Sequence, residues 1–178
     1  MAGVRVSMLS QGVSRMSLLE LFQWIQDTHV GTLIRESIWV YPGILAVHVL
    51  ALTVSVGTLV WFDLRLLGVN MRSQPISQVY RQLMPLMLGG FLVMFVTGGF
   101  LFWALAGKLY GNIYFRIKVL ALLSAGINAL IFHMMTERTI ADWDAGPSPP
   151  MRVRMAGLAS MVFWIVTIAA GRRIVLGL

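Results

Sequence analysis

Two histidines stand inside long apolar stretches of this sequence, and they are the first candidates for chemistry. His48 lies near the middle of the apolar block 38–62, and His133 lies near the end of the block 113–135. An ionisable group in apolar surroundings is costly, so it either serves a function or hydrogen-bonds a neighbouring helix. A neutral imidazole is a good ligand for haem iron and for copper. We therefore take His48 as the first candidate ligand and His133 as the second.

The depths of the two histidines decide whether they can share one cofactor. If both blocks are helices that cross a membrane in the same direction, their Cα atoms differ in depth by roughly 16 Å at ~1.5 Å per residue. A haem held by two histidines needs both at similar depth. The spacing therefore favours two separate sites, or a pair of one histidine and one methionine.

Methionines supply the soft partner that such a pair needs. Met94 is expected near the depth of His48, and Met87 lies toward His133, which Met134 follows directly. Histidine with methionine suits Cu(I) and also low-spin haem iron. The alternative is that these methionines only fill gaps in the packing, as methionine commonly does.

Small residues recur at helical spacing around these candidates. Ala51 and Ser55 share the face of His48, and Gly90, Met94 and Gly98 form a second stripe. Such stripes let helices approach closely, and they also leave room for a flat macrocycle. If His48 is a ligand, we expect these two stripes to line one cavity. A further stripe of this kind is formed by Gly157, Ser160, Trp164, Thr167 and Gly171.

Charged residues gather at the ends of the apolar blocks. Arg116, Lys118 and Arg172 are candidates to bind haem propionates, an anionic substrate or lipid headgroups, or they extend to the membrane surface. Asp63 and Arg65 end the first block, where a structural ion pair is expected.

Composition sets the elements that position these residues. The chain has 178 residues, of which 58% are hydrophobic and 12% are charged, and its mean hydropathy is +0.79. A soluble domain of this size has no core large enough for so much apolar surface. The sequence thus predicts an all-α integral membrane protein. Four apolar blocks separated by short connections predict an up-down four-helix bundle with both termini on one side, called side A; the blocks are residues 38–62, 83–106, 113–135 and 156–170.

The segment before the first block predicts a further helix. Ser17 and Glu20 have the spacing of a capping box, and apolar residues follow at helical spacing. Trp24 suits the headgroup zone, so this helix is expected to lie in the membrane interface. The predicted organisation is a tail with an interfacial amphipathic helix over residues 1–36, and a four-helix transmembrane domain over residues 37–178.

Other function classes are excluded by what the sequence lacks. It has no cysteine, which excludes thiolate metal sites and iron–sulfur clusters. Its net charge of +7 comes from residues scattered over loops and helix ends, so nucleic acid is not an expected partner. No nucleotide-binding or hydrolase motif is present.

Several stretches resemble an uncharacterised bacterial family of integral membrane proteins with four helices. The resemblance covers about residues 37–173, and its most specific part is the run 63–68. That family is in turn similar in size and architecture to b-type cytochrome and copper-resistance membrane subunits, which implies a fold and no activity. The matching stretches are Tyr41-Pro42 with His48, Gly57 with residues 62–68, Phe115-Arg116-Ile117-Lys118, and Gly171-Arg172.

These observations lead to a first functional hypothesis and two alternatives. The first is a subunit of the bacterial inner membrane that binds haem b and passes electrons within a larger complex. Its expected partners are the lipid bilayer, other membrane or periplasmic redox subunits, or further copies of itself. The alternatives are a copper-handling transporter or sensor, with His48, His133, Met87 and Met94 as metal ligands, and a structural or assembly subunit without a cofactor.

Overall fold

The computed structural model describes residues 17–71, 73–136, 144 and 149–177, and within these ranges every element is a helix. Two short helices are followed by four long ones. Each long helix is long and apolar enough to cross a membrane, so the chain is a multi-pass membrane protein in contact with lipid. In chain order the helices are α2 (Leu18–Gln26), α3 (His29–Glu36), α4 (Val40–Leu66), α5 (Ile76–Tyr110), α6 (Ile113–Thr136) and α8 (Met151–Leu176).

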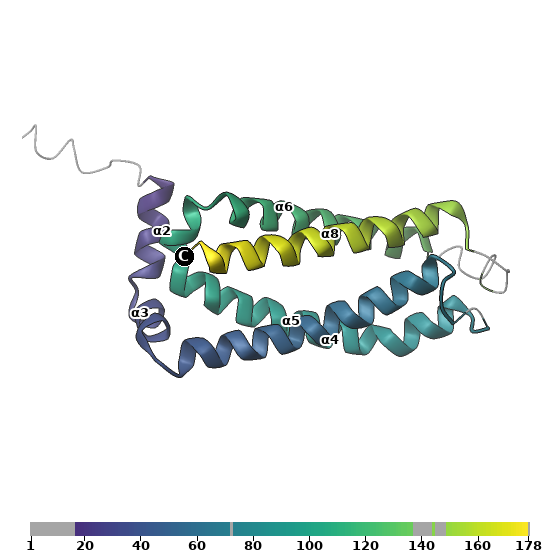
Figure 1. Ribbon diagram of the computed structural model, residues 1–178, viewed down its shortest axis with the longest axis horizontal. Helices are drawn as coiled ribbons and strands as arrows, with labels where there is room; N and C mark the ends of the chain where they lie inside the picture. Colours follow the sequence, from purple (N-terminus) through teal and green to yellow (C-terminus); the bar gives the residue numbers. More distant parts are fainter. Residues whose placement is uncertain (1–16, 72, 137–143, 145–148, 178) are drawn as a thin grey trace, which may run out of the picture.

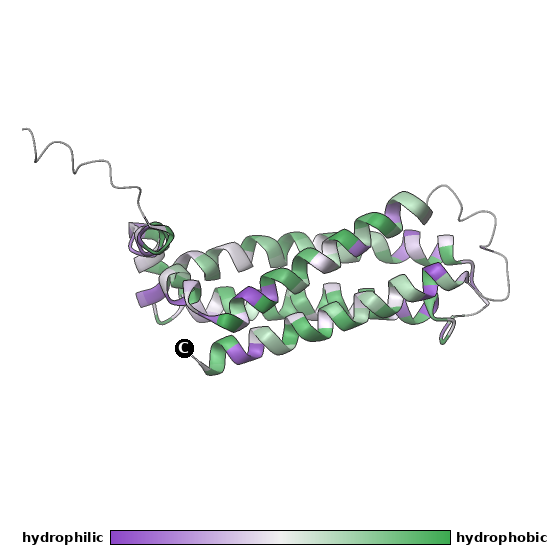
Figure 2. Cartoon of the chain, turned by 90° about the horizontal axis from the view of Figure 1, so that it is seen from above, coloured by the Kyte–Doolittle hydropathy of each residue, from purple (hydrophilic) through white to green (hydrophobic). Residues whose placement is uncertain are grey.

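The four long helices lie side by side as two pairs (Figure 1). α4 packs along α5, α6 packs along α8, and the pairs meet mainly through α4 and α8. Side A is the end that holds α2, α3 and the C-terminal end of α8, and side B is the end where α4 stops and α5 begins. Figure 2 shows hydrophobic residues along most of the length of the long helices, as lipid-facing surfaces require.

The long helices extend past the apolar blocks that predict them. α5 begins seven residues before Leu83, and α8 begins five residues before Ala156. The 35 residues of α5 reach roughly 52 Å, well beyond a hydrocarbon core of ~30 Å. Polar residues continue a helix at the membrane surface because its backbone hydrogen bonds are still satisfied there, so hydropathy alone underestimates the helix length.

The sequence run 63–68, the most specific part of the family resemblance, contains the turn that ends α4. Gly68 has a φ of +75°, and the N–H of Val69 donates to the carbonyl oxygen of Leu64 at 2.9 Å. This is a Schellman motif, in which a residue with positive φ ends the helix and glycine adopts that φ without strain. The guanidinium of Arg65 donates to the carbonyl oxygen of Gln74 at 2.7 Å and so fixes the connection to α5.

Two apolar clusters hold the helices together. In the middle of the bundle, the ring of Phe91 on α5 stacks on Trp164 of α8, with ring centroids 5.2 Å apart, beside Val56 of α4 and Ala125 of α6. All four long helices therefore meet at this level. Near side B, a second cluster consists of α4 and α5 side chains that are at most 3% exposed: Phe62, Leu66, Ile76 and Val79.

The N-terminal segment forms two helices where one was predicted. The capping box of α2 is present, because Ser17 Oγ accepts from the N–H of Glu20 and the Glu20 carboxylate accepts from the N–H of Ser17. A new helix starts after Thr28, whose Oγ1 accepts from the N–H of Gly31 at 3.3 Å. Its hydroxyl caps α3 as an N-cap residue does, and this separates α3 from α2.

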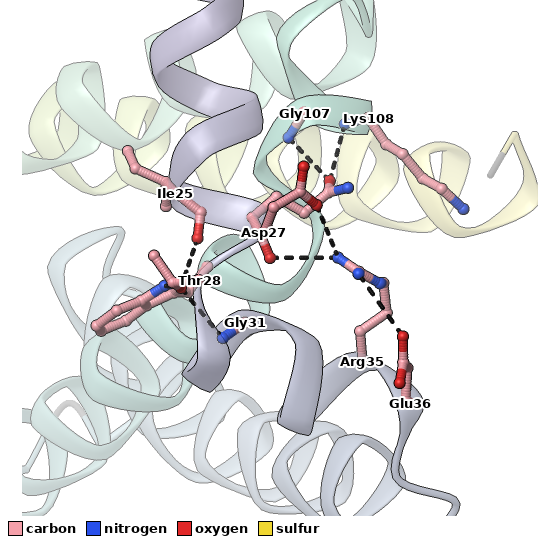
Figure 3. A network of polar contacts seen from close by, with 10 residues as sticks. Ile25, Asp27, Thr28, Gly31, Arg35, Glu36, Gly107 and Lys108 are labelled. Carbon is pink, nitrogen blue, oxygen red and sulfur yellow. Dashed lines mark hydrogen bonds and ion pairs between the residues drawn. The ribbon is translucent and has the colours of Figure 1, made fainter.

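Both short helices pack against the side-A end of α5, and α5 is irregular there. Leu105 has non-helical dihedral angles, and the N–H groups of Gly107 and Lys108 donate to the side-chain oxygen of Gln26 at 3.0 and 3.4 Å. The indole N–H of Trp103 donates to Thr28 Oγ1 at 2.7 Å. Figure 3 shows this network, which we call the side-A clamp. Gln26 therefore supplies the acceptor for N–H groups next to the break in α5.

Candidate functional site

His48 is held in the contact between α4 and α5, in the half of the bundle nearer side A. Its Nδ1 lies 2.9 Å from Thr97 Oγ1. Its Cε1 lies 3.1 Å from the position that a Cβ would take at Gly98, so the absence of a side chain there makes room for the ring. The imidazole is half-buried. The Nδ1 atom of His48 thus faces α5, where the side chain of Thr97 fixes the orientation of the ring.

The hydrogen bonds of Thr97 assign the tautomer of His48. The Thr97 hydroxyl donates its only proton to the carbonyl oxygen of Val93 at 2.7 Å. Thr97 therefore accepts from His48, which places the proton of the neutral ring on Nδ1. Nε2 then carries the lone pair of the neutral ring, and the backbone of Met94 on α5 also lies beside the imidazole. A histidine that binds a metal is oriented in this way, with its other nitrogen donating to a fixed acceptor.

The small residues of α4 and α5 close the contact between these helices. A Cβ at Gly90 would lie 2.8 Å from the Cβ of Ser55. Ser55 is fully buried, and its hydroxyl donates to the carbonyl oxygen of Ala51. The expectation that these stripes line a cavity is wrong between α4 and α5, because Ser55 fills the space at Gly90 and His48 fills the space at Gly98.

Lys118 lies in the same half of the bundle, between α6 and α8. Its Nζ lies 3.6 Å from the position of a Cβ at Gly171, and the residue is half-buried. An electrostatic interaction reaches from Lys118 to His48. In the part of the chain that the structure describes, its ammonium has no hydrogen bond or ion pair. One turn before Gly171, Thr167 is 3% exposed and its hydroxyl has no partner.

The two arginines predicted to act with Lys118 lie on the outside. Arg116 is exposed, and its guanidinium donates to the carbonyl oxygen of Tyr110 at 3.4 Å. Arg172 is also exposed, while its neighbour Arg173 lies over the ring of Tyr114 at 5.5 Å. Of the three predicted cations, Lys118 is half-buried, whereas Arg116 and Arg172 are exposed.

His133 lies far from His48. It is exposed near side B, with Nδ1 3.2 Å from the hydroxyl of Tyr80 on α5. Tyr80 and Thr97 are 17 residues apart on α5, which corresponds to roughly 26 Å along that helix. This separation along the helix exceeds the roughly 16 Å expected from the sequence. One haem does not bridge the two imidazoles.

The methionines proposed as ligands have packing contacts. Met87 is buried, and Met94 packs against the central cluster. Met134, which follows His133 in the sequence, is 63% exposed. No group of three or more histidine, aspartate or glutamate side chains gathers among the described residues.

The partner of Asp63 differs from the one that the sequence predicts. The predicted ion pair with Arg65 is wrong for the described residues: the Asp63 carboxylate hydrogen-bonds Ser160 of α8, and its Oδ2 has no partner. Residues i and i+2 of a helix point to different sides, so Asp63 and Arg65 separate. A signal was available, because Asp63 is the only acidic residue in the four long helices.

Comparison with known proteins identifies the family. No curated protein and no solved structure matches the chain. Residues 21–177 match the profile described as Family of unknown function (DUF6644), and this range includes both His48 and Asp63. The chain belongs to this family, the Family of unknown function (DUF6644).

Proposed function

We propose that this protein is a membrane subunit that binds haem b through His48 and passes electrons. The observation that carries the proposal is the hydrogen bond from His48 Nδ1 to Thr97, which leaves Nε2 with the lone pair of the neutral ring inside a membrane protein.

The residues around His48 fit one axial ligand and one anion partner. His48 would bind the iron, and Lys118, which has an electrostatic interaction with His48, would pair with a propionate. Met94 lies on α5, the helix that His48 Nδ1 faces, and packs against the central cluster. A haem at this position would supply a centre for one-electron transfer.

The proposal includes an arrangement in the membrane. The four long helices would cross the bacterial inner membrane up and down, and α2 and α3 would lie in the interface on side A. Exposed apolar side chains of α2, Leu18 and Trp24, support that placement, since each is 64% exposed in the chain alone. Because His48 lies in the half nearer side A, a redox partner would dock at this side.

Haem loading of the purified protein tests the proposal. We expect a Soret band for the wild type and its loss in His48→Ala, while the variant remains folded by circular dichroism. His133→Ala is the matched control and should keep the band, because His133 lies at the other end of the bundle. A wild type without a Soret band after loading, or a His48→Ala variant that retains it, contradicts the proposal.

The Thr97→Val variant allows a second measurement, the haem reduction potential, which would stay unchanged if His48 had only a packing role. This substitution keeps the shape of the side chain and removes the acceptor for Nδ1–H. The imidazole then becomes a weaker donor to iron, so the haem reduction potential should rise. An unchanged potential in Thr97→Val would show that the hydrogen bond to Thr97 does not tune the ligand.

A further inference from the structure

A carboxyl group is sealed between α4 and α8 near side B, far from the proposed haem site. Asp63 is 2% exposed, its carboxylate hydrogen-bonds Ser160, and Oδ2 has no partner. Gly157 brings the two helices together at this point, since a Cβ there would lie 3.3 Å from the carbonyl oxygen of Asp63 and 3.2 Å from the Cβ of Leu66. No side chain fits between the helices at this level.

We propose that Asp63 is a proton-binding site within the membrane, which exchanges its proton with water on side B. An ionised carboxylate with an unpartnered oxygen is far more costly to bury than the neutral acid. Uptake of one proton by Oδ2 removes that charge, and release returns the proton to water. The proposal does not depend on haem binding.

The side chains around Asp63 favour the binding of a proton over the binding of a metal ion. Among the described residues, Asp63 belongs to no group of three or more histidine, aspartate or glutamate side chains that could hold a metal ion. Ser160, with a hydroxyl, is the neighbour on α8, and it is itself buried. A single carboxyl with one hydroxyl offers too few ligands for a dehydrated metal cation.

The charged and titratable groups at this level include residues of all four long helices. Arg65 of α4 turns its guanidinium to the carbonyl oxygen of Gln74. Tyr80 of α5 and His133 of α6 contact each other. At this level the exposed cations on α5 and α8 are Arg81, Arg152 and Arg154, and the carboxylate of Asp144 accepts from the N–H of Ser77 at the start of α5. Among the described residues, no ion pair joins any of these exposed cations to Asp63.

The side chains on the inner face of α8 indicate the side of the bundle on which Asp63 exchanges its proton with water. Trp164, one turn from Ser160 toward side A, is 6% exposed and stacks on Phe91. This apolar contact separates Asp63 from Thr167 and Lys118. Asp63 lies only three residues from the end of α4 at Leu66, so the short route to water leads to side B.

Infrared difference spectroscopy of the full-length protein in lipid vesicles tests the proposal. We expect a carbonyl stretching band of a protonated carboxyl that disappears reversibly as the pH rises and shifts when the water is replaced by D₂O. Asp63→Asn should lack this band, and Ser160→Ala should shift its frequency because a hydrogen bond is lost. Glu36→Gln, which changes an exposed carboxylate on α3, is the matched control and should leave the band unchanged.

Three results would overturn the assignment. The first is no such band at any pH at which the protein stays folded, because Asp63 would then always be ionised. The second is a band that neither responds to pH nor shifts in D₂O, because the proton would then never exchange. The third is loss of the band on addition of sodium at constant pH, because a cation would then compete for the site. The Ser160→Ala variant keeps the test valid if Asp63→Asn does not fold.

Discussion

The two halves of the bundle bury their polar groups in opposite ways. In the side-A half, His48 and Lys118 are half-buried: Nδ1 of His48 contacts Thr97, and among the described residues the ammonium of Lys118 has no hydrogen bond or ion pair. In the side-B half, Asp63 is enclosed beside a cluster that contains the almost fully buried Phe62 and Leu66.

The difference shows which chemistry each half can support. Half-buried donors and acceptors can reach a bound molecule without unpacking the helices. An enclosed carboxyl has no such space, so only a proton can reach it at little cost. The side-A half is therefore suited to a ligand, and the side-B half is suited to charge uptake within a rigid contact.

The largest expected effect tests the rigidity of the side-B half. Phe62 is 3% exposed and contacts the rings of Tyr80 and Phe132. Phe62→Ala leaves a cavity and should lower the free energy of unfolding by roughly 3 kcal/mol, measured by denaturation in detergent.

The matching change in the side-A half is Phe102→Ala. Phe102 contacts Phe22 and Phe115 but is only partly buried. We expect Phe102→Ala to lower the free energy of unfolding by about half as much as Phe62→Ala, because neighbouring side chains or lipid fill the gap. If Phe102→Ala proves as costly as Phe62→Ala, the two halves are packed equally and the comparison fails.

The next effect concerns the close contact of α4 and α5. Gly90→Ala places a Cβ 2.8 Å from the Cβ of Ser55, against backbone that has no room to move. It should destabilise the protein by about 2 kcal/mol through overpacking.

Gly89→Ala is the control at the neighbouring position. No atom lies within 4 Å of a Cβ at Gly89, so this variant should be neutral or slightly more stable, because alanine favours a helix over glycine. Equal melting temperatures for the two variants would show that Gly90 does not set the distance between the helices.

The smallest effect concerns the side-A clamp. Gln26→Ala removes the acceptor for the N–H groups of Gly107 and Lys108 and should cost about 1 kcal/mol. Amide hydrogen exchange should become faster at these two positions and across α2 and α3, while α4 stays protected.

Gln23→Ala changes an exposed glutamine on the same helix and has no such hydrogen bond in the described structure. It should leave exchange in α5 unchanged. Faster amide exchange at Gly107 in the Gln23→Ala variant would show that the packing of α2 as a whole, and not the Gln26 side chain, protects this amide.

Local sequence patterns determined the class of protein and most of its elements. The four spanning helices follow from apolar length, because lipid leaves no alternative partner for backbone N–H and C=O groups. The capping box at Ser17 and Glu20 is also local, since its two hydrogen bonds lie within one turn. The inward face of α8, from Gly157 to Gly171, follows from helical spacing and is buried at Ser160, Trp164 and Thr167.

The tertiary structure alone decided how polar groups pair across helices. Helical spacing tells which residues share a face, but the register between two helices depends on how their side chains interlock along the whole contact. For this reason the sequence placed Asp63 with Arg65, whereas the structure places it with Ser160, 97 positions away in the chain.

His48 illustrates the same division. Its position inside a membrane helix is evident from the sequence, because one imidazole interrupts an apolar block. That its Nδ1 faces Thr97 and its ring occupies the space at Gly98 depends on the register of α4 against α5. The sequence identified the group capable of chemistry, and the packing of the helices determined which of its nitrogens faces Thr97, because that depends on long-range contacts that no local pattern encodes.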